Sequence, residues 1–285
     1  SVLHVFSQWF RTPVAAPGPQ VGSVGPVTRT AYLDHPGPIP LAHRGFDRDG
    51  LENSMPAFQA AVDLGFSYLE TDVHATSDGV LVAFHDESLD RVTDSVGTVA
   101  SMPWAHVSQA RIGGVEEIPR LEVMLHTWPE ARFNIDIKAS AAIGPLVRVI
   151  ERARAHDRVC VTSFSDTRRR QALRRLTRPV VTSAGQITTA RFRAASQAAA
   201  RSRRTLVSWA MRDADGLQVP VSFRGLPVVT DRTVAAAHAA GKFVHVWTVN
   251  DPAEMHRLLD LGVDGLVSDR ADLLKQVLTE RGQWV

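Results

Sequence analysis

Residue types that could carry out chemistry are concentrated between positions 41 and 86. Five residues of this segment stand out, namely His43, Arg44, the closely spaced carboxylates Glu70 and Asp72, and His85. Histidine has an ordinary pKa of about 6.5 and therefore exchanges protons at neutral pH. Arginine binds anions, and carboxylates bind metal cations. Together these residues predict a catalytic site that acts on an anionic substrate.

The carboxylates have a spacing suited to metal ligation. Glu70 and Asp72 are two residues apart in a predicted strand, so their side chains share one face with Cβ atoms roughly 6 to 7 Å apart. Asp136 and Lys138 repeat this spacing in a later predicted strand. Ligation by oxygen alone favours Mg²⁺, Ca²⁺ or Mn²⁺ over zinc. We therefore expect Glu70, Asp72 and Asp136 to hold one divalent cation.

An alternative is a buried ionic network in which these three carboxylates pair only with Arg44 and Lys138. Three negative charges against two positive charges leave an excess, which would raise the pKa of at least one carboxyl group. A divalent cation would neutralise that excess, so the charge balance favours a metal site. A measurement of metal binding distinguishes the two.

The histidines and the basic residues together indicate phosphodiester chemistry. His43 and His85 flank the acidic cluster and are expected to act as general acid and general base. Arg44 and Lys138 are expected to bind the phosphate, with the metal offsetting charge on its oxygens. One imidazole would activate the nucleophile and the other would protonate the departing alkoxide; the sequence leaves open which does which. The following histidines are instead expected on the surface or on helices: His4, His35, His106, His126, His156, His238 and His256.

Short β-branched runs alternate with longer amphipathic segments from residue 39 onward, as is typical of βα units with a parallel sheet. Eight such strands in succession predict an α/β fold, a closed (β/α)8 TIM barrel. A hairpin-like arm at 80–84 and a short, loop-rich insertion at 91–119 follow the second strand. The predicted strands span residues 39–43, 68–73, 133–137, 159–163, 180–183, 206–209, 243–249 and 265–268. The predicted helices span 55–64, with Asn53 or Ser54 as cap, and 121–128, 168–178, 233–240, 252–261 and 271–280.

In such a barrel the reacting groups gather where strands end and βα loops begin. The candidate residues occupy these positions. Two further candidates at the end of the seventh predicted strand are Trp247 and Asn250. Trp247 is expected either to line the site or to pack in the core. Phe164 is a further lining candidate. Glu52 is expected either at the start of a helix, as a capping group, or near the metal.

Composition indicates one globular domain and no nucleic-acid partner. The 285 residues carry a net charge of only +2, and residues 1–38 form a lead-in rich in proline and glycine before a domain at 39–285. Cys160 is the only cysteine, which excludes an internal disulfide and a thiolate cluster, and it is expected in the core. No apolar run is long enough for a spanning helix, so no stable membrane insertion is expected.

We expect a cytoplasmic protein. Because the chain begins at Ser1, its origin from a trimmed precursor stays an open alternative. Secretion or membrane association stays open for the same reason. The Arg-rich segment 168–178 is typical of a solvated outer helix, for which an anionic membrane surface is the alternative interpretation. The sequence leaves the oligomeric state open.

An ordered series of motifs resembles the glycerophosphodiester phosphodiesterase family. The likeness extends over residues 39–281. Its motifs are Ala42-His43-Arg44-Gly45, Glu52-Asn53-Ser54, Glu70-Thr71-Asp72, Ser77-Asp78-Gly79 and Phe84-His85-Asp86, followed by segments at 118–122, 163–165, 241–250 and 262–265.

This resemblance implies hydrolysis of glycerophosphodiesters to sn-glycerol 3-phosphate and an alcohol, with Mg²⁺ or Ca²⁺. The roles it implies are the acid/base pair for His43 and His85, phosphate contacts for Arg44 and Lys138, metal ligation for Glu70 and Asp72, and an apolar wall against glycerol for Trp247. Asp136 departs from the pattern, because the family commonly has glutamate as third ligand. The shorter side chain implies a metal closer to its strand, or a water in between.

Three other functions are alternatives to this one. A lysophospholipase D would use the same site on a diester that still carries one acyl chain. A barrel that binds a phosphorylated ligand without hydrolysing it would lack a catalytic group, and none is missing here. An isomerase or aldolase barrel is disfavoured because 250–252 is not a phosphate-binding glycine loop.

Overall fold

The computed structural model describes residues 31–285, so most of the predicted lead-in lies outside the described residues. The described chain opens with the 3-10 helix η1 (Ala31–Leu33), whose Tyr32 is fully buried. Tyr32 packs edge-on against Tyr68 with ring centroids 5.3 Å apart, and the Tyr68 hydroxyl donates to the Tyr32 carbonyl at 2.6 Å. Because Tyr68 is the first residue of its strand, Tyr32 covers the amino-terminal end of the sheet described next.

Eight parallel strands form a nearly closed barrel, which confirms the predicted fold class. Their spatial order is β8-β7-β6-β2-β1-β13-β12-β9, and a bridge between Ser183 and Gly216 joins the two outer strands. Nearly every strand residue is buried, because helices cover the outside and side chains fill the inside. The strands are β1 (Ile39–His43), β2 (Tyr68–Ala75), β6 (Arg132–Ile137), β7 (Val159–Thr162), β8 (Val181–Thr182), β9 (Gly216–Pro220), β12 (Phe243–Trp247) and β13 (Gly265–Ser268).

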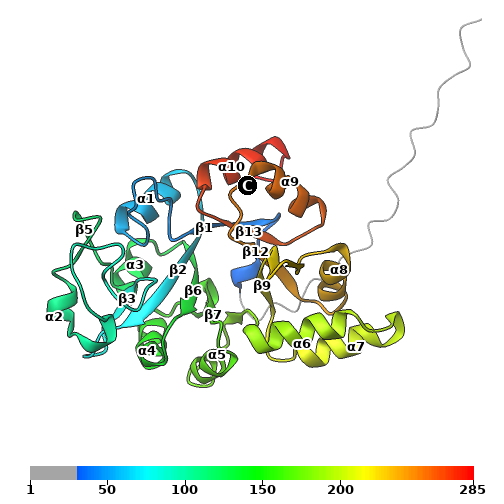
Figure 1. Ribbon diagram of the computed structural model, residues 1–285, viewed down its shortest axis with the longest axis horizontal. Coiled ribbons are helices and arrows are strands. Elements are labelled where there is room, and N and C mark those ends of the chain that lie inside the picture. Colours follow the sequence, from blue (N-terminus) through cyan, green and yellow to red (C-terminus); the bar gives the residue numbers. More distant parts are fainter. Residues whose placement is uncertain (1–30) are drawn as a thin grey trace, which may run out of the picture.

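Helices surround this barrel (Figure 1). The first of them shows why they begin where they do: the Ser54 hydroxyl accepts from the Ala57 amide at 3.2 Å, and Pro56 stands in the first turn. The helices are α1 (Met55–Asp63), α3 (Leu121–Thr127), α4 (Ile143–Ala153), α5 (Asp166–Leu173), α6 (Gln186–Ser196), α7 (Ala200–Ala210), α8 (Asp231–Ala239), α9 (Pro252–Asp260) and α10 (Ala271–Glu280), with short 3-10 turns η3 (Ser140–Ala142) and η4 (His156–Arg158).

The prediction of a sixth strand at 206–209 was wrong. These residues belong to helix α7, and the sixth barrel strand is β9. In α7 the buried residues are Val207 and Ala210, three apart on one helical face, whereas Trp209 between them is 60% exposed. A strand would have placed alternate residues on the same face, so the burial follows helical periodicity.

Two other local predictions also need correction. The Arg-rich helix α5 ends at Leu173 rather than at 178, and one of its arginines, Arg169, is fully buried. The Arg169 guanidinium pairs with Asp166 at 3.3 Å and Asp213 at 3.2 Å, so it is not part of a solvated face. His156 was expected on the surface or on a helix; it lies in the 3-10 helix η4, where it is buried. Cys160 is buried as predicted, and burial raises its pKa.

The segment after β2 forms a compact unit with its own small core. The predicted arm is β3 (Leu81–Ala83), antiparallel to β2. The insertion that follows contains η2 (Val99–Ser101), α2 (Trp104–Val107), β4 (Arg111–Ile112) and β5 (Glu116–Glu117). Its core consists of Val82, Phe84, Leu89, Val99, Val107, Ala110, Ile112 and Ile118. This packing holds His85, which directly follows Phe84, at one side of the barrel mouth.

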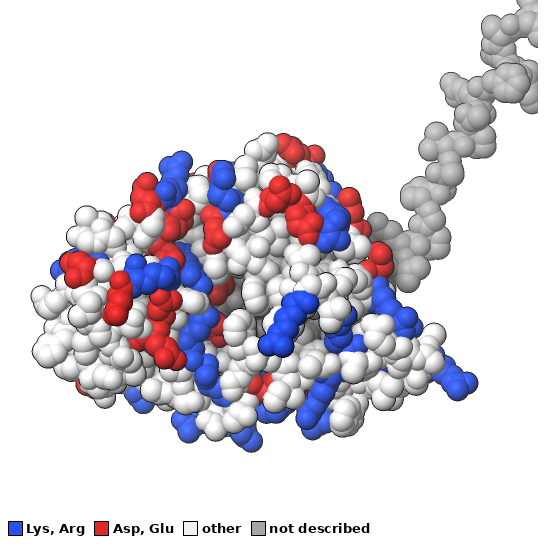
Figure 2. Space-filling model, viewed as in Figure 1, with Lys and Arg blue, Asp and Glu red and all other residues white. Residues whose placement is uncertain are grey.

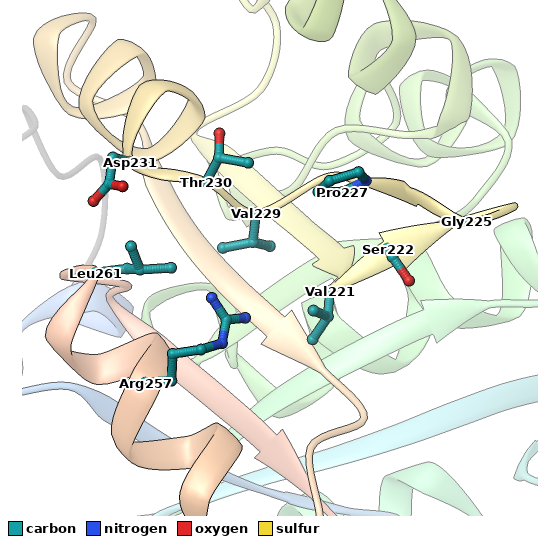
Figure 3. Close-up of a pocket in the computed structure, with 9 residues that line it drawn as sticks. All are labelled: Val221, Ser222, Gly225, Pro227, Val229, Thr230, Asp231, Arg257 and Leu261. Carbon is teal, nitrogen blue, oxygen red and sulfur yellow. The ribbon is translucent and has the colours of Figure 1, made fainter.

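A β-hairpin at the opposite side of the mouth follows β9. It pairs β10 (Ser222–Phe223) with β11 (Leu226–Pro227), and Arg224 and Gly225 form its turn with φ of 50° and 77°. Positive φ at both central residues is the geometry of a tight two-residue turn. A hollow of about 320 Å³ lies between the hairpin and helix α9, and the residues that line it are drawn in Figure 3. The hairpin thus projects from the barrel.

No helix within residues 31–285 is both long and apolar enough to cross a membrane.

Candidate active site

The carboxyl ends of the barrel strands surround a pocket of about 270 Å³. Figure 2 shows this face hollowed near its middle, with acidic and basic side chains side by side at one edge. All eight residues predicted from the sequence lie on the pocket, although they come from separate strands and loops. The lining residues are His43, Arg44, Glu70, Asp72, His85, Asn134, Asp136, Lys138, Thr162, Phe164, Ala184, Gln218, Trp247, Thr248 and Val267.

Two cations and two aspartates form a chain of ion pairs at one wall of the pocket. Asp72 and Asp136 are paired neighbours on β2 and β6, so their carboxylates point the same way. The Lys138 ammonium lies between them, 2.8 Å from Asp72 Oδ1 and 2.7 Å from Asp136 Oδ2. The Arg44 Nε lies 2.9 Å from the other Asp72 oxygen. Burial alone would raise the pKa of Asp72, but Lys138 and Arg44 outweigh it and hold that pKa below its ordinary value.

Of the three pocket carboxylates, Glu70 is the one with no lysine or arginine side chain within 4 Å among the described residues, although its Oε2 accepts from the Arg44 amide at 3.3 Å. It is buried, and its nearest cationic group is the His43 ring, with Nε2 3.7 Å from Oε2. Burial, reinforced by the negative charge of Asp72, raises the pKa of Glu70 to about 7. Burial also raises the pKa of Asp136 despite its contact with Lys138. The wall of the pocket therefore holds more buried negative charge than its two cations neutralise.

The turn after β1 places Arg44 in the pocket through an unusual backbone. Arg44 has φ of 55° and is followed by Gly45 with φ of 90°. A Cβ at Gly45 would lie 2.6 Å from the Ala57 carbonyl carbon, so only glycine fits there. The turn is anchored because the Arg44 amide donates to the Glu70 carbonyl at 3.0 Å. This left-handed backbone is costly for a residue with a side chain, and in this turn the Arg44 guanidinium reaches Asp72 in the pocket.

His43 is paired with a carboxylate that the sequence reasoning missed. Its Nδ1 lies 2.5 Å from Asp269 Oδ1, at the end of β13. The Asn250 amide donates to the other Asp269 oxygen at 2.7 Å, which explains the position of Asn250 near the site. Burial alone would lower the pKa of His43, but Glu70 and the hydrogen bond to Asp269 outweigh it and raise that pKa. The only signal in the sequence was the polar residue that follows the eighth strand.

His85 has a carboxylate partner of its own, from the next residue. Its Nδ1 lies 2.5 Å from Asp86 Oδ1. Arg91 donates to the other oxygen of Asp86 at 2.5 Å and lowers the pKa of Asp86 to about 2. Arg91 also reaches Glu52 at 2.7 Å, and Glu52 accepts from Arg44 at 3.0 Å. Glu52 therefore joins the two arginines, rather than capping helix α1.

An apolar wall and an amide pair complete the pocket. The rings of Phe164 and Trp247 stack with centroids 5.7 Å apart, so both candidates line the site rather than the core alone. Across the barrel, the side-chain amides of Asn134 and Gln218 exchange two hydrogen bonds, at 3.1 and 2.9 Å. These amides satisfy each other at the pocket floor, where an unpaired polar group would be costly.

The donor set fits a hard divalent cation, although the side chains are not gathered around one point. Within residues 31–285 no group of three or more histidine, cysteine, aspartate and glutamate side chains is arranged as a metal site. The buried Asp136 Oδ1, however, finds no hydrogen-bond partner among the described residues. This oxygen and the raised pKa of Glu70 mark buried negative charge that an oxygen-preferring cation would stabilise.

Comparison with known proteins relates this geometry to a family. A sequence model of the glycerophosphoryl diester phosphodiesterase family matches residues 43–273. A Mycobacterium tuberculosis protein named probable glycerophosphodiester phosphodiesterase 2 is 47% identical over 264 residues, covering 92% of this chain and 98% of that protein. The chain belongs to the glycerophosphoryl diester phosphodiesterase family.

Solved structures agree with the barrel seen here. A glycerophosphodiester phosphodiesterase from Agrobacterium tumefaciens aligns with a TM-score of 0.67 and 25% identity, over 82% of this chain and 98% of that one. An Oleispira antarctica phosphodiesterase, solved with the product sn-glycerol-3-phosphate, aligns with a TM-score of 0.69 and 24% identity, over 87% of this chain and 99% of that one. The resemblance to the glycerophosphodiester phosphodiesterase family and the assignment as a hydrolase of that family are thus confirmed.

For this phosphodiesterase, Asp269→Asn is expected to lower kcat roughly 10²-fold, because the neutral amide no longer orients or stabilises a protonated His43. Asp269 raises the pKa of His43. Its loss should therefore move the pH-rate limb governed by His43 to lower pH. The measurement is a pH-rate profile on a soluble diester, with Asp272→Asn as control. Asp272 pairs with Arg270 at 2.7 Å outside the pocket. An unchanged profile would show that Asp269 has no positioning role.

Proposed function

We propose that this protein hydrolyses glycerophosphodiesters to sn-glycerol 3-phosphate and an alcohol, and that the reaction requires Mg²⁺ or Ca²⁺. One observation carries the proposal: two imidazole–carboxylate pairs, His43 with Asp269 and His85 with Asp86, border a pocket whose wall holds the Arg44–Asp72–Lys138 ion pairs. Proton carriers and phosphate-binding cations are then available around one phosphorus atom.

The two histidines would move the protons that the reaction requires. One imidazole takes a proton from water as its oxygen bonds to phosphorus. The other donates a proton to the alcohol oxygen as the bond from phosphorus to that oxygen breaks. Because Asp269 and Asp86 each accept from Nδ1, the Nε2 atoms of His43 and His85 are left for this task.

Arg44 and Lys138 would hold the phosphate. Both cations are kept in place by Asp72, so their remaining N–H groups are pre-oriented toward the pocket. Glu70, Asp72 and Asp136 would hold the divalent cation, which when bound offsets charge on the non-bridging phosphate oxygens. Phe164 and Trp247 would supply an apolar wall for the glycerol carbons.

We predict that glycerophosphocholine, glycerophosphoethanolamine or glycerophosphoglycerol releases glycerol 3-phosphate when Mg²⁺ or Ca²⁺ is added, and that a chelator stops the release. A thermal melt with and without each cation, run without substrate, reports binding separately from turnover. Lack of turnover of all three diesters with either metal would overturn the proposed function. Turnover that persists in chelator, with no metal-induced shift in Tm, would instead support the ionic network without a metal.

The same assay with lysophosphatidylcholine as substrate tests the alternative function, lysophospholipase D activity on a diester that keeps one acyl chain. The exposed Phe164, 49% accessible beside the pocket, is the observation that favours testing it. Faster release of choline from the lyso-lipid than from glycerophosphocholine would identify a lysophospholipase D.

A further inference from the structure

Four large apolar side chains are exposed around one side of the barrel mouth. They are Phe164, Ile187, Phe223 and Leu226, with exposed fractions of 49%, 59%, 58% and 62%. Each follows the carboxyl end of β7, β8 or β9, which are neighbours in the barrel. We call these four residues the apolar rim. Their common position places them on one edge of the pocket entrance.

The hairpin carries the most prominent part of the apolar rim. Phe223 and Leu226 are paired across its two strands, immediately beside the turn. All residues from 222 to 227 are exposed. The hollow beneath the hairpin (Figure 3) separates it from helix α9, and the Arg193 guanidinium donates to the Pro227 carbonyl at its base. The two apolar side chains are thus held away from the barrel rather than folded against it.

The sequence beside the apolar rim is strongly basic. Residues 167–212, which include most of α5 and all of α6 and α7, contain twelve arginines and neither aspartate nor glutamate. Because the whole chain carries only +2, the rest of it is net acidic. Figure 2 shows mostly basic side chains over the region that α6 and α7 occupy in Figure 1, whereas both signs mix near α1 and β5.

Several of these arginines are not neutralised within the described chain. Arg191, Arg201, Arg204 and Arg212 are exposed, and none forms an ion pair with another residue of 31–285. The hairpin turn adds the exposed Arg224. A positive surface beside protruding apolar side chains matches the headgroup and acyl layers of an anionic lipid surface.

We propose that the apolar rim docks this protein on an anionic lipid bilayer surface. Phe223, Leu226 and Ile187 enter the boundary between headgroups and acyl chains, while the arginines of α6 and α7 face anionic headgroups. This orientation turns the pocket entrance toward the lipid interface. A nucleic acid would use the arginines but would leave the isolated Leu226 and Ile187 exposed to water, so the combined surface fits lipid better.

The experiment is flotation of the full chain with vesicles of equal phosphatidylglycerol and phosphatidylcholine, and with vesicles of phosphatidylcholine alone. We expect binding to the anionic vesicles to be about tenfold tighter and to weaken in 0.5 M salt. Phe223→Ser combined with Leu226→Ser should weaken it by about another tenfold. The matched control is Val96→Ser with Val115→Ser, two residues that are 79% and 65% exposed on the insertion. All variants should hydrolyse a soluble diester at the wild-type rate.

Three results would overturn the proposal. The first is no flotation with anionic vesicles, or equal flotation with neutral ones. The second is unchanged binding by the Phe223/Leu226 double variant, together with equally tight binding to an oligonucleotide, which would indicate a general affinity for polyanions. The third is concentration-dependent self-association that the double variant abolishes, since the apolar rim would then be an interface between copies of this chain.

Discussion

Replacement of His43 or of His85 by alanine is expected to lower kcat about 10²- to 10⁴-fold, the range that a positioned general acid or base contributes. Each ring lies on the pocket and is fixed by a carboxylate, Asp269 or Asp86, at 2.5 Å. Because Asp269 still accepts from Asn250 and Asp86 still accepts from Arg91 after the imidazole is removed, little unfolding should accompany the loss. Initial rates of glycerol 3-phosphate release, together with a thermal melt of each variant, measure the two effects separately.

A matched control is available in His238, which also pairs with a carboxylate. Its Nε2 lies 2.8 Å from Asp264 Oδ2, away from the residues that line the pocket. His238→Ala should keep full activity. If His43→Ala or His85→Ala retained more than about a tenth of the wild-type kcat, the histidine concerned would not be part of the acid/base pair.

The same variants can establish which histidine is the acid. A diester with a p-nitrophenol leaving group needs no proton at the departing oxygen, because the phenolate is already stable. The variant that lacks the general acid should therefore recover much of its activity on this substrate. The variant that lacks the general base should not recover. Equal recovery by both variants would contradict a division of the two roles between His43 and His85.

Lys138→Met is expected to abolish turnover and to destabilise the fold by about 3 kcal/mol. The substitution keeps most of the side-chain volume but removes the ammonium that lies between Asp72 and Asp136, at 2.8 and 2.7 Å. Two buried carboxylates would then face each other with only Arg44 to offset them. Chemical denaturation gives the free energy of unfolding, and the diester assay gives the rate.

A double variant separates the structural role of Lys138 from its role toward phosphate. Lys138→Met with Asp136→Asn removes one of the two carboxylates and should regain part of the lost stability without regaining turnover. Lys275→Met is the control, since Lys275 donates to the Leu64 carbonyl at 2.8 Å outside the pocket. Full activity in Lys138→Met would exclude a phosphate contact by this residue.

One of the proposed metal ligands, Asp136, has a buried carboxylate oxygen next to an oxygen already paired with Lys138. The Lys138 ammonium donates to Oδ2 of Asp136, whereas the buried Oδ1 has no hydrogen-bond partner among the described residues. A glutamate at this position would extend one methylene further into the pocket. A cation at the proposed site would compete with Lys138 for Asp72 and Asp136, and the thermal melt with Mg²⁺ and Ca²⁺ tests whether a cation binds.

Local sequence patterns were sufficient to predict the barrel and the eight residues on its pocket. The reason is physical: alternate strand residues share a face, and all parallel strands of a barrel end at the same mouth. Glu70 and Asp72 could thus be placed together, and Asp136 and Lys138 beside them, from spacing alone. The same local argument failed at 206–209, because a short apolar run is compatible with a strand or with one buried helix face.

Only the tertiary structure decided which charges meet. His43 and Asp269 are 226 positions apart and become partners because the closing barrel places β13 beside β1. Glu52 contacts Arg91 across 39 positions, and of the two alternatives that the sequence left open, a capping group or a residue near the site, this contact favours the second. Periodicity reports which face a side chain occupies, but it carries no information on the distance to a residue from another element. The sequence by itself therefore determined the eight predicted residues of the pocket, and the fold decided their partners, Asp269 among them, and so how each proton carrier is held.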